Sequence, residues 1–421
     1  MKVLPWAEDV AATVAALRAF APPAAEVRAA VTEIVADVRA RGDDAVRAHT
    51  SRLDGVELAA DYAVSAQERR RRLAELAPGL REALELAAGN VREYHRREAP
   101  AAWRATLPQG QVVGQEVVPL AVAGLYVPGG LANYPSSVLM TAIPPQVAGV
   151  GRVVVCSPPR RGGGAAAGVA AACELLGVDD LFPIGGAQAV AAMAFGTATI
   201  PRCDVIVGPG NAYVTEAKRQ VMGAVAIDGL AGPSEVLVIA DETAKPAWLA
   251  ADLLAQAEHG SGSMACLADI GGTLAGPVGA AVTALAAELG IGHDNVAVVA
   301  CPDRAAAVAL CNAFGPEHLE LHVADAAALV PRIRNAGAIF VGAHAATAFA
   351  DYAAGSNHVL PTGGSARFAQ GLSVTAFQKR VAVVELDAAA AAALAPYVAA
   401  IADEEGLRAH ARSARLRALE E

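Results

Sequence analysis

The chain has 421 residues, of which 54% are hydrophobic and 18% are charged, and its formal net charge at pH 7 is −10. This length predicts two or three domains, and the hydrophobic content excludes an intrinsically disordered chain. The acidic balance argues against a nucleic-acid-binding surface, which requires clustered lysine and arginine side chains.

No segment is typical of secretion or membrane insertion. Glu8 and Asp9 interrupt the apolar N-terminus before the hydrophobic region of a signal peptide forms. The alanine-rich stretch 388–402 is too short to span a bilayer and contains a proline. The six cysteines show no C-x-x-C spacing, and several lie in apolar runs such as VVVC. These features predict a reduced, cytoplasmic protein with no membrane partner.

Helices are predicted for the chain up to about residue 105. Apolar residues recur at helical spacing through 27–41, 46–52 and 68–91, with charged residues on the opposite face. The sequence Gly42-Asp43-Asp44 separates the first two stretches as a helix stop followed by an N-cap.

From Pro119 onward, short apolar runs alternate with alanine-rich helical stretches such as 165–176 and 187–195. The first series is PLAVAGLYV, RVVVC, DDLFPI and CDVIV, and the second is EVLVIAD, MACLADI, NVAVVA, HLELHV and AIFVG. Strands that are apolar on both faces and alternate with helices are typical of parallel sheets covered on both sides. The sequence therefore predicts two α/β units of similar plan. The tail from Val381 is predicted to be helical, with 403–421 packed at an edge or on a partner subunit.

Gln256 and His259 close the apolar run ADLLAQAEH. Because they are three residues apart, both are expected on one helix face, where an amide oxygen and an imidazole can bind a metal ion. Taken alone, the segment is better explained as the solvated polar end of an amphipathic helix.

Asp351 and His358 delimit the segment DYAAGSNH, which is rich in turn-forming residues. The composition predicts a loop that presents an acid and an imidazole, as loops at functional sites often do. A turn with a capping histidine explains the same residues equally well.

Two further pairs combine a carboxylate with an imidazole. Glu317 and His318 follow Gly-Pro at the start of the strand-like run HLELHV and are suited to proton transfer. Neighbours on a strand face opposite sides, so the Gly-Pro turn must present both, and a surface pair is the commoner explanation. Glu405 and His410 lie about 140° apart around a helix, so their joint use requires a bend.

The sequence Gly208-Pro209-Gly210-Asn211 follows a predicted strand and precedes a predicted helix. Backbone N–H groups at such a helix start can bind a phosphate. The third glycine of a dinucleotide fingerprint is missing, however, and a tight strand–helix turn explains the motif as well. The same holds for Gly185-Gly186-Ala187-Gln188 and for the segment that begins at Tyr126.

Taken in order, these segments resemble the histidinol dehydrogenase family. The matching strings are GLYVPGG, YPSSVLM, GGAQAVAAMAFGT, GPGNAYVTEAKR, AGPSEV, QAEHGSGS, GPEHLEL, DYAAGSNHVLPTGG, FQKR and EEGLRAH. Each string alone is common, but their joint occurrence from about residue 120 to 410 is specific.

The resemblance implies a zinc- and NAD-dependent enzyme of histidine biosynthesis that oxidises L-histidinol to L-histidine in two steps. Glu317 is implied to activate water and His318 to act as general acid/base. The implied zinc ligands are Gln256, His259, Asp351 and His410, the last from the other subunit of a homodimer. The implied substrate contacts are these four ligands and His318, together with Ser136, Ser234, His358 and Glu405. The implied NAD-site residues are Tyr126, Gln188 and Asn211.

The family likeness also implies two Rossmann-like parallel-sheet domains, one inserted in the other. The expected division is an N-terminal arm (1–22), a larger domain (23–125 with 236–378), an inserted NAD domain (126–235) and a C-terminal helical segment that reaches the partner (379–421). Three alternatives stay open: a related dehydrogenase for another small amino alcohol or diol, a metal-stabilised protein without catalysis, and a zinc hydrolase.

Overall fold

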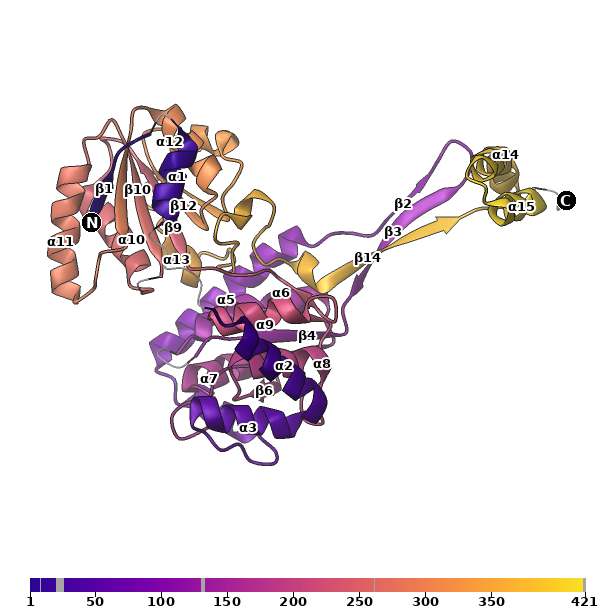
Figure 1. Cartoon of the computed structure of the whole chain (residues 1–421), viewed down its shortest axis with the longest axis horizontal. Helices are drawn as coiled ribbons and strands as arrows, with labels where there is room; N and C mark the ends of the chain where they lie inside the picture. Colours follow the sequence, from indigo (N-terminus) through magenta and orange to yellow (C-terminus); the bar gives the residue numbers. More distant parts are fainter. Residues whose placement is uncertain (8, 20–25, 130–132, 261, 419–421) are drawn as a thin grey trace.

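The computed structural model describes residues 1–7, 9–19, 26–129, 133–260 and 262–418. Two parallel sheets, each covered by helices, form the main body, and a long ribbon of three strands projects from it (Figure 1). The prediction of two α/β units of similar plan is confirmed.

Five parallel strands form the sheet in the middle of the chain. In spatial order they are β6 (Asp180–Phe182), β5 (Arg152–Cys156), β4 (Val122–Tyr126), β7 (Val205–Val207) and β8 (Ala226–Ile227). The helices that cover it are α6 (Pro135–Ala148), α7 (Ala167–Leu175), α8 (Gly186–Phe195) and α9 (Ala212–Val221). Because the sheet has a hydrophobic core on each face, its strands are continuous apolar runs.

Six parallel strands form the second sheet. In spatial order they are β1 (Lys2–Leu4), β11 (Val296–Cys301), β10 (Met264–Ile270), β9 (Glu235–Ala240), β12 (His318–His322) and β13 (Ala338–Val341). Its helices include α1 (Val10–Arg18), α10 (Pro246–Ala257), α11 (Ala275–Leu289) and α12 (Arg304–Phe314). Leaving β1 aside, we number the five remaining strands by their order in the chain. Their order across the sheet is then 3-2-1-4-5, and the other sheet has the same order.

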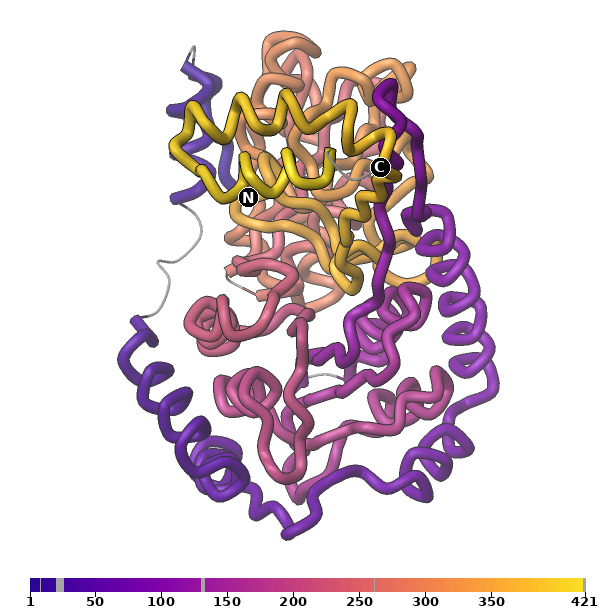
Figure 2. Tube along the Cα trace, turned by 90° about the vertical axis from the view of Figure 1, so that its right-hand side faces the viewer, coloured from indigo at the N-terminus to yellow at the C-terminus, as the bar shows by residue number. Residues whose placement is uncertain are grey.

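The helices of residues 28–98 pack on the five-stranded unit and wrap around its outside (Figure 2). They are α2 (Arg28–Arg41), α3 (Asp43–Asp54), α4 (Ala66–Ala74) and α5 (Pro78–Glu98). α2 contacts α8 and α9, α4 contacts α7, and α5 contacts α6. This packing differs from the predicted grouping of 23–125 with 236–378. Helical periodicity identifies which face of a helix is buried, but not the element on which that face packs.

The N-terminal segment belongs to the six-stranded unit. β1 pairs with β11 in parallel, and α1 packs on α12. Arg18 at the end of α1 forms an ion pair with buried Glu235, donates a hydrogen bond to Phe314 O at 2.7 Å and lies over the Phe314 ring. The predicted boundary at residues 22 and 23 lies outside the described residues.

The projecting ribbon is antiparallel and was missed by the sequence analysis. Its strands, in spatial order, are β14 (Gln378–Glu385), β3 (Val112–Pro119) and β2 (Trp103–Thr106). The predicted helix from Val381 is therefore wrong for residues 381–385. Most side chains of β14 are exposed, so in this chain the ribbon has no apolar face that packs on a core.

Two helices pack side by side at the far end of the ribbon (Figures 1 and 2). They are α14 (Ala388–Glu404) and α15 (Arg408–Arg417), whose small shared core is Ala399, Ala402 and Ala411. Tyr397 and Ile401 on α14 are 68% and 62% exposed. A protruding tip with large apolar side chains in water is typical of an interaction surface.

The remaining elements are short. They are η1 (Ala326–Arg332), α13 (Thr347–Tyr352), η2 (Ser365–Arg367) and η3 (Val374–Phe377). All six cysteines are buried free thiols. In the part of the chain that the structure describes, no helix has the length and apolar content needed to cross a membrane.

A buried ion pair fixes the turn between β7 and α9. Gly208 has φ +111°, and a Cβ atom there would lie 2.1 Å from Tyr126 O, so only glycine fits. Asp228 accepts a hydrogen bond from Gly208 N at 2.7 Å and pairs with Lys218, whose ammonium also donates to Gly208 O at 3.1 Å. Lys218 is 2% exposed.

We predict that Asp228→Asn lowers the free energy of unfolding by about 3 kcal/mol, because it leaves the Lys218 ammonium buried without a counter-charge. Urea denaturation measures this change. The control is Asp180→Asn, which removes the carboxylate from an exposed pair with Arg152 and is expected to cost less than about 1 kcal/mol. Equal losses in the two variants would contradict the prediction.

Candidate active site

Glu317 and His318 present their side chains together at the amino end of β12. Glu317 Oε2 accepts hydrogen bonds from Ser234 Oγ at 2.6 Å and from Glu235 N at 2.9 Å. His318 Nδ1 lies 3.1 Å from Glu235 O and 3.5 Å from Glu317 Oε2. The strand begins only at His318, so Glu317 still belongs to the preceding turn and strand alternation does not separate the pair.

The tautomer of His318 follows from its neighbours. A carbonyl oxygen can only accept, so His318 Nδ1 carries the hydrogen that bonds Glu235 O. Nε2 is then the basic nitrogen. It is buried, has no hydrogen-bond partner among the described residues, and lies 3.7 Å from Asp351 Oδ1. A buried imidazole with a free basic nitrogen is suited to taking a proton from a ligand.

Burial and neighbouring charges tune this pair. Burial raises the pKa of Glu317, against the opposing effects of His318 and the Ser234 hydrogen bond. For His318, burial acts to lower the pKa, but the charges of Glu317 and Asp351 outweigh it and raise the pKa above its ordinary value. Shifts of this kind, caused by burial and by charged neighbours, are common for acid–base groups in active sites.

Gln256 and His259 lie at the end of α10. Gln256 is 4% exposed, its Oε1 lies 3.4 Å from Ser234 Oγ, and its Nε2 is buried without a partner in the described ranges. The helix ends at Ala257, so His259 lies beyond it and is exposed rather than sharing a helix face with Gln256. Gln256, His259 and Asp351 nevertheless line one cavity of about 70 Å³.

Asp351 lies in the last turn of α13, whereas the sequence analysis placed it in a loop. The loop begins after Tyr352 and carries His358, whose Nδ1 lies 3.0 Å from Asp351 O. Burial lowers the pKa of His358, against the opposing effects of the Asp351 charge and of the hydrogen bond to Asp351 O. The same loop is fastened to α6 by Asn357, which donates to Met140 O at 2.7 Å.

Asn357 was missed as a residue that builds the site. Its Nδ2 also lies 3.1 Å from Nε2 of His95, a fully buried side chain on α5. α6 carries Ser136 in its first turn, so Asn357 attaches the His358 loop to the helix that carries this predicted substrate contact. The string SNH identifies the segment, but it does not indicate that the Asn357 amide attaches this loop to α6.

Glu405 and His410 lie at the tip of the ribbon, away from the other predicted ligands of the same chain (Figure 1). α14 ends at Glu404 and α15 begins at Arg408, with Gly406 at φ +73° between them. This break supplies the bend that their joint use requires. Both side chains are exposed.

The three predicted NAD-site residues lie at the carboxyl edge of the five-stranded sheet. Tyr126 ends β4, Gln188 lies in the first turn of α8, and Asn211 caps α9 by accepting from Tyr213 N and Val214 N. The strand order reverses between β4 and β7, and open α/β sheets bind ligands at such a point.

Tyr126 and Gln188 are held by other parts of the same unit. Tyr126 Oη accepts a hydrogen bond from Gly186 N at 3.1 Å, and burial raises the pKa of Tyr126 to about 12. Gln188 Nε2 donates to Asp54 Oδ2 at 3.3 Å, and its Oε1 is buried without a partner among the residues described. Tyr126 therefore stays neutral and acts through packing and hydrogen bonding.

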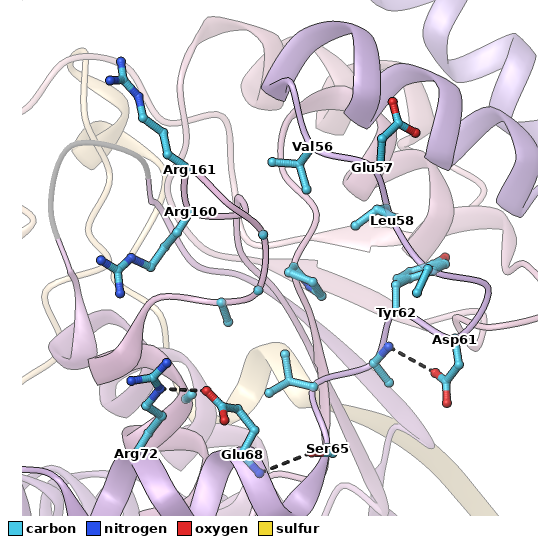
Figure 3. A pocket seen from close by; sticks show the side chains of 18 residues that line it. Val56, Glu57, Leu58, Asp61, Tyr62, Ser65, Glu68, Arg72, Arg160 and Arg161 are labelled. Carbon is cyan, nitrogen blue, oxygen red and sulfur yellow. Dashed lines mark hydrogen bonds and ion pairs between the residues drawn. The ribbon is translucent and has the colours of Figure 1, made fainter.

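A separate cavity of about 610 Å³ opens beyond the carboxyl end of β5 (Figure 3). Arg160 and Arg161 lie on one side of it, and Glu57 and Asp61 lie on the other. Its walls are thus of mixed charge. None of the described residues that line it is among the predicted site residues, so this cavity is distinct from the cluster around His318.

Among the residues that the structure describes, two sets of side chains have the composition of a metal site. The first is Gln256, His259 and Asp351, which share a cavity and include an unpartnered buried amide. The second is Asp252, Glu320 and His322, whose ligand atoms all lie within 4.8 Å of one another. The sequence analysis missed the second set, although Glu320 and His322 are two apart on one strand and so share a face.

Comparison with known proteins identifies the family. Residues 21–418 match the family model for histidinol dehydrogenase. The chain is 46% identical to histidinol dehydrogenase of Pseudomonas aeruginosa over 93% of this chain and 91% of that protein. It is 48% identical to that of Rhizobium meliloti over 93% and 92%. The crystal structure of histidinol dehydrogenase from Elizabethkingia anophelis superimposes with a TM-score of 0.94 at 32% identity, covering 99% of this chain and 98% of the other. The chain therefore belongs to the histidinol dehydrogenase family of enzymes.

Proposed function

We propose that this enzyme oxidises L-histidinol to L-histidine through histidinal, as a step of histidine biosynthesis, using two NAD in turn and one zinc ion that positions the substrate. The observation that carries the proposal is the buried Glu317–His318 pair, with the free Nε2 of His318 close to Asp351, which lines the cavity with Gln256 and His259. Family membership supplies the substrate class.

The residues present fit zinc. An amide oxygen, an imidazole and a carboxylate form a ligand set of the kind that Zn²⁺ accepts, and four ligands are usual. Gln256, His259 and Asp351 would hold the ion, with His410 of the partner subunit as the fourth ligand. Bound zinc would anchor the amino and imidazole nitrogens of histidinol and, having no accessible redox couple, would leave the electrons to NAD.

The five-stranded unit fits NAD. We assign the cofactor to residues 126–235, where Tyr126, Gln188 and Asn211 lie at the carboxyl edge beside the reversal of strand order. Gly208 allows the turn after β7 to approach the end of β4 closely, which suits backbone contacts to a diphosphate. Bound there, NAD would supply the hydride acceptor for each oxidation.

His318 acts in the first oxidation. Its Nε2 takes the proton of the substrate hydroxyl as the carbon gives up a hydride, which leaves the aldehyde and one proton on the imidazole. The imidazolium is stabilised by the carboxylates of Glu317 and Asp351, 3.5 and 3.7 Å from its two nitrogens. The Nδ1–H···O=C bond to Glu235 keeps the ring oriented throughout.

Glu317 acts in the second oxidation. Its carboxylate takes a proton from water, whose oxygen attacks the aldehyde carbon to form the hydrate. His318, having given its first proton to the carbonyl oxygen during this attack, takes a hydroxyl proton of the hydrate as the carbon gives up the second hydride. The resulting carboxylic acid loses its remaining proton to solvent. Hydrogen bonds from Ser234 Oγ and Glu235 N fix Oε2 of Glu317, so Oε1 is the oxygen free to approach water.

A homodimer with shared active sites completes this arrangement. The exposed apolar side chains of α14 suit burial against a second copy, and the ribbon holds Glu405 and His410 far from their own cluster. We propose that both residues enter the partner's active site. The six unpaired cysteines accord with a cytoplasmic location.

The overall reaction predicts two NADH per L-histidinol consumed, counted at 340 nm with zinc-loaded protein. Chelation is expected to abolish NADH formation, and added zinc to restore it. One NADH per substrate would contradict the second oxidation. If the protein binds zinc and NAD but does not turn over histidinol, the result would favour another small amino alcohol or a diol as its substrate.

We predict that Glu317→Gln lowers the oxidation of supplied histidinal by about 10²-fold or more and that of histidinol to the aldehyde by much less, because only the second step needs water activated. Single-turnover kinetics on each substrate measure the two steps. Ser234→Ala is the control, because it removes a hydrogen bond that positions the Glu317 side chain but leaves the Glu317 carboxylate in place. Equal losses in both steps would exclude the assigned role.

Shared sites predict complementation between two variant chains that form little histidine from histidinol. Glu317→Gln and His410→Ala, co-expressed in equal amounts, should regain about one quarter of the wild-type rate of histidine formation, because half the dimers are mixed and each has one intact site. Glu317→Gln with Asp351→Asn is the matched control and should regain none, since both residues belong to one chain's cluster. No recovery in the first pairing would show that His410 serves its own chain.

A further inference from the structure

A second buried cluster lies beside the candidate active site, on the same face of β12. His318, Glu320 and His322 alternate along the strand and therefore point to one side of the sheet. Glu320 and His322 are 0% and 2% exposed. Asp252 on α10, one helical turn before Gln256, brings its Oδ2 to 3.7 Å from His322 Nε2. Asp252, Glu320 and His322 have no role in the mechanism described above.

Glu320 holds the start of α13. Its Oε1 accepts hydrogen bonds from Thr347 N at 2.7 Å and Thr347 Oγ1 at 2.8 Å. The N-cap position of this helix is Ala346, whose side chain cannot accept a hydrogen bond. The carboxylate of Glu320 therefore satisfies a free N–H group at the helix start and places a negative charge at the positive end of the helix dipole.

Other hydrogen bonds of α13 lie at its carboxyl end, where His358 Nδ1 is 3.0 Å from Asp351 O and Asn90 donates to Ala353 O at 2.8 Å. The helix is six residues long, and isolated helices of this length are unstable in water. Ala350 is buried, but Phe349 and Tyr352 are 64% and 63% exposed. The contact with Glu320 is thus a principal anchor for the helix. Asp351 follows Thr347 by four residues, so a shift of the first turn moves the carboxylate that faces His318.

The other oxygen of Glu320 links the anchor to α10. Glu320 Oε2 lies 3.2 Å from His322 Nε2. Asp252 Oδ2 lies 3.7 Å from the same nitrogen, and burial together with the charge of Glu320 raises the pKa of Asp252 to about 7. The network therefore ties together the helix that carries Gln256, the strand that carries His318 and the helix that carries Asp351.

We propose that Glu320 is a positioning residue for the active site: with Asp252 and His322, it holds α13 so that Asp351 stays aligned with His318 and, on the proposed function, with the zinc ion. A second cation in the cluster is the competing explanation. The cluster is poorly suited to one, because Nδ1 of His322 is buried without a partner in the described chain. A metal-bound imidazole normally donates its other N–H group.

The test uses the full-length protein and two substitutions. Glu320→Met removes the carboxylate at similar side-chain length, whereas Glu320→Gln keeps an oxygen that can accept from Thr347. Asp269→Asn is the matched control: Asp269 is a fully buried carboxylate on β10 that accepts from Leu274 N and Ala275 N, both at 2.9 Å, at the start of α11. α11 carries no site residue.

Hydrogen exchange in metal-free protein reports the anchor directly. We expect Glu320→Met to accelerate exchange in residues 347–352 by about tenfold or more, Glu320→Gln to do so less, and Asp269→Asn to affect residues 275–289 instead. Unchanged exchange in 347–352 for Glu320→Met would overturn the proposal whether or not the protein binds zinc.

Metal affinity and the visible spectrum of Co²⁺-loaded protein report the effect on Asp351. Glu320→Met is expected to lose about 10- to 100-fold in zinc affinity and to change the Co²⁺ spectrum, whereas Asp269→Asn lowers the melting temperature without either effect. Wild-type affinity and spectrum in Glu320→Met would overturn the proposal, as would a second bound zinc per chain that this variant loses. Wild-type protein that binds no zinc would refute the zinc site of the proposed function. The hydrogen-exchange result would still test whether Glu320 anchors α13.

Discussion

The backbone of one residue, Glu235, orients both side chains of the proposed acid–base pair. The N–H of Glu235 donates to Glu317, and the C=O of the same residue accepts from His318. These contacts exist because β9 and β12 are parallel neighbours in which His318 lies opposite Val236, so the two strands begin at the same edge of the sheet. The side chain of Glu235 is in turn paired with Arg18 from α1. The strand register thus sets the acid–base geometry, and the N-terminal helix supports it.

The two units contribute opposite edges of similar sheets. Tyr126, Gln188 and Asn211 lie at the carboxyl edge of the five-stranded sheet, where ligands of open α/β folds usually bind. Glu317 and His318 lie at the amino edge of the six-stranded sheet. The short connection from β8 to β9 passes through Ser234, which joins the two regions in sequence. Asn357 joins them in space by fastening the His358 loop to α6.

The sequence predicts what depends on local pattern. Runs such as RVVVC and EVLVIAD are apolar on both faces because helices cover both sides of each sheet, so the two units and their plan could be recognised. The role of α2 could not, because the apolar face of Val31 and Ile34 fits any helix layer of suitable shape. The ribbon was missed because β14 is exposed in the single chain and lacks the burial that produces a strand pattern.

The candidate site shows the same division. The string GPEHLEL located Glu317 and His318, but their common orientation depends on the backbone of Glu235, more than eighty residues earlier in the chain. Glu320 looked like one polar residue of a strand, and its part in holding α13 depends on a contact with Thr347 that no local pattern encodes. The role proposed for His410 requires an assembly, because its own chain holds this residue away from Gln256, His259 and Asp351 (Figure 1).

The central claim is that one chain's Gln256, His259 and Asp351 and the partner's His410 form a single zinc site beside His318. Diffraction from zinc-loaded crystals, with an anomalous map at the zinc edge, tests this claim most directly. We expect one strong peak per active site, bound by those four side chains. A peak at Asp252, Glu320 and His322, or a zinc ion without His410 of the partner subunit, would contradict it.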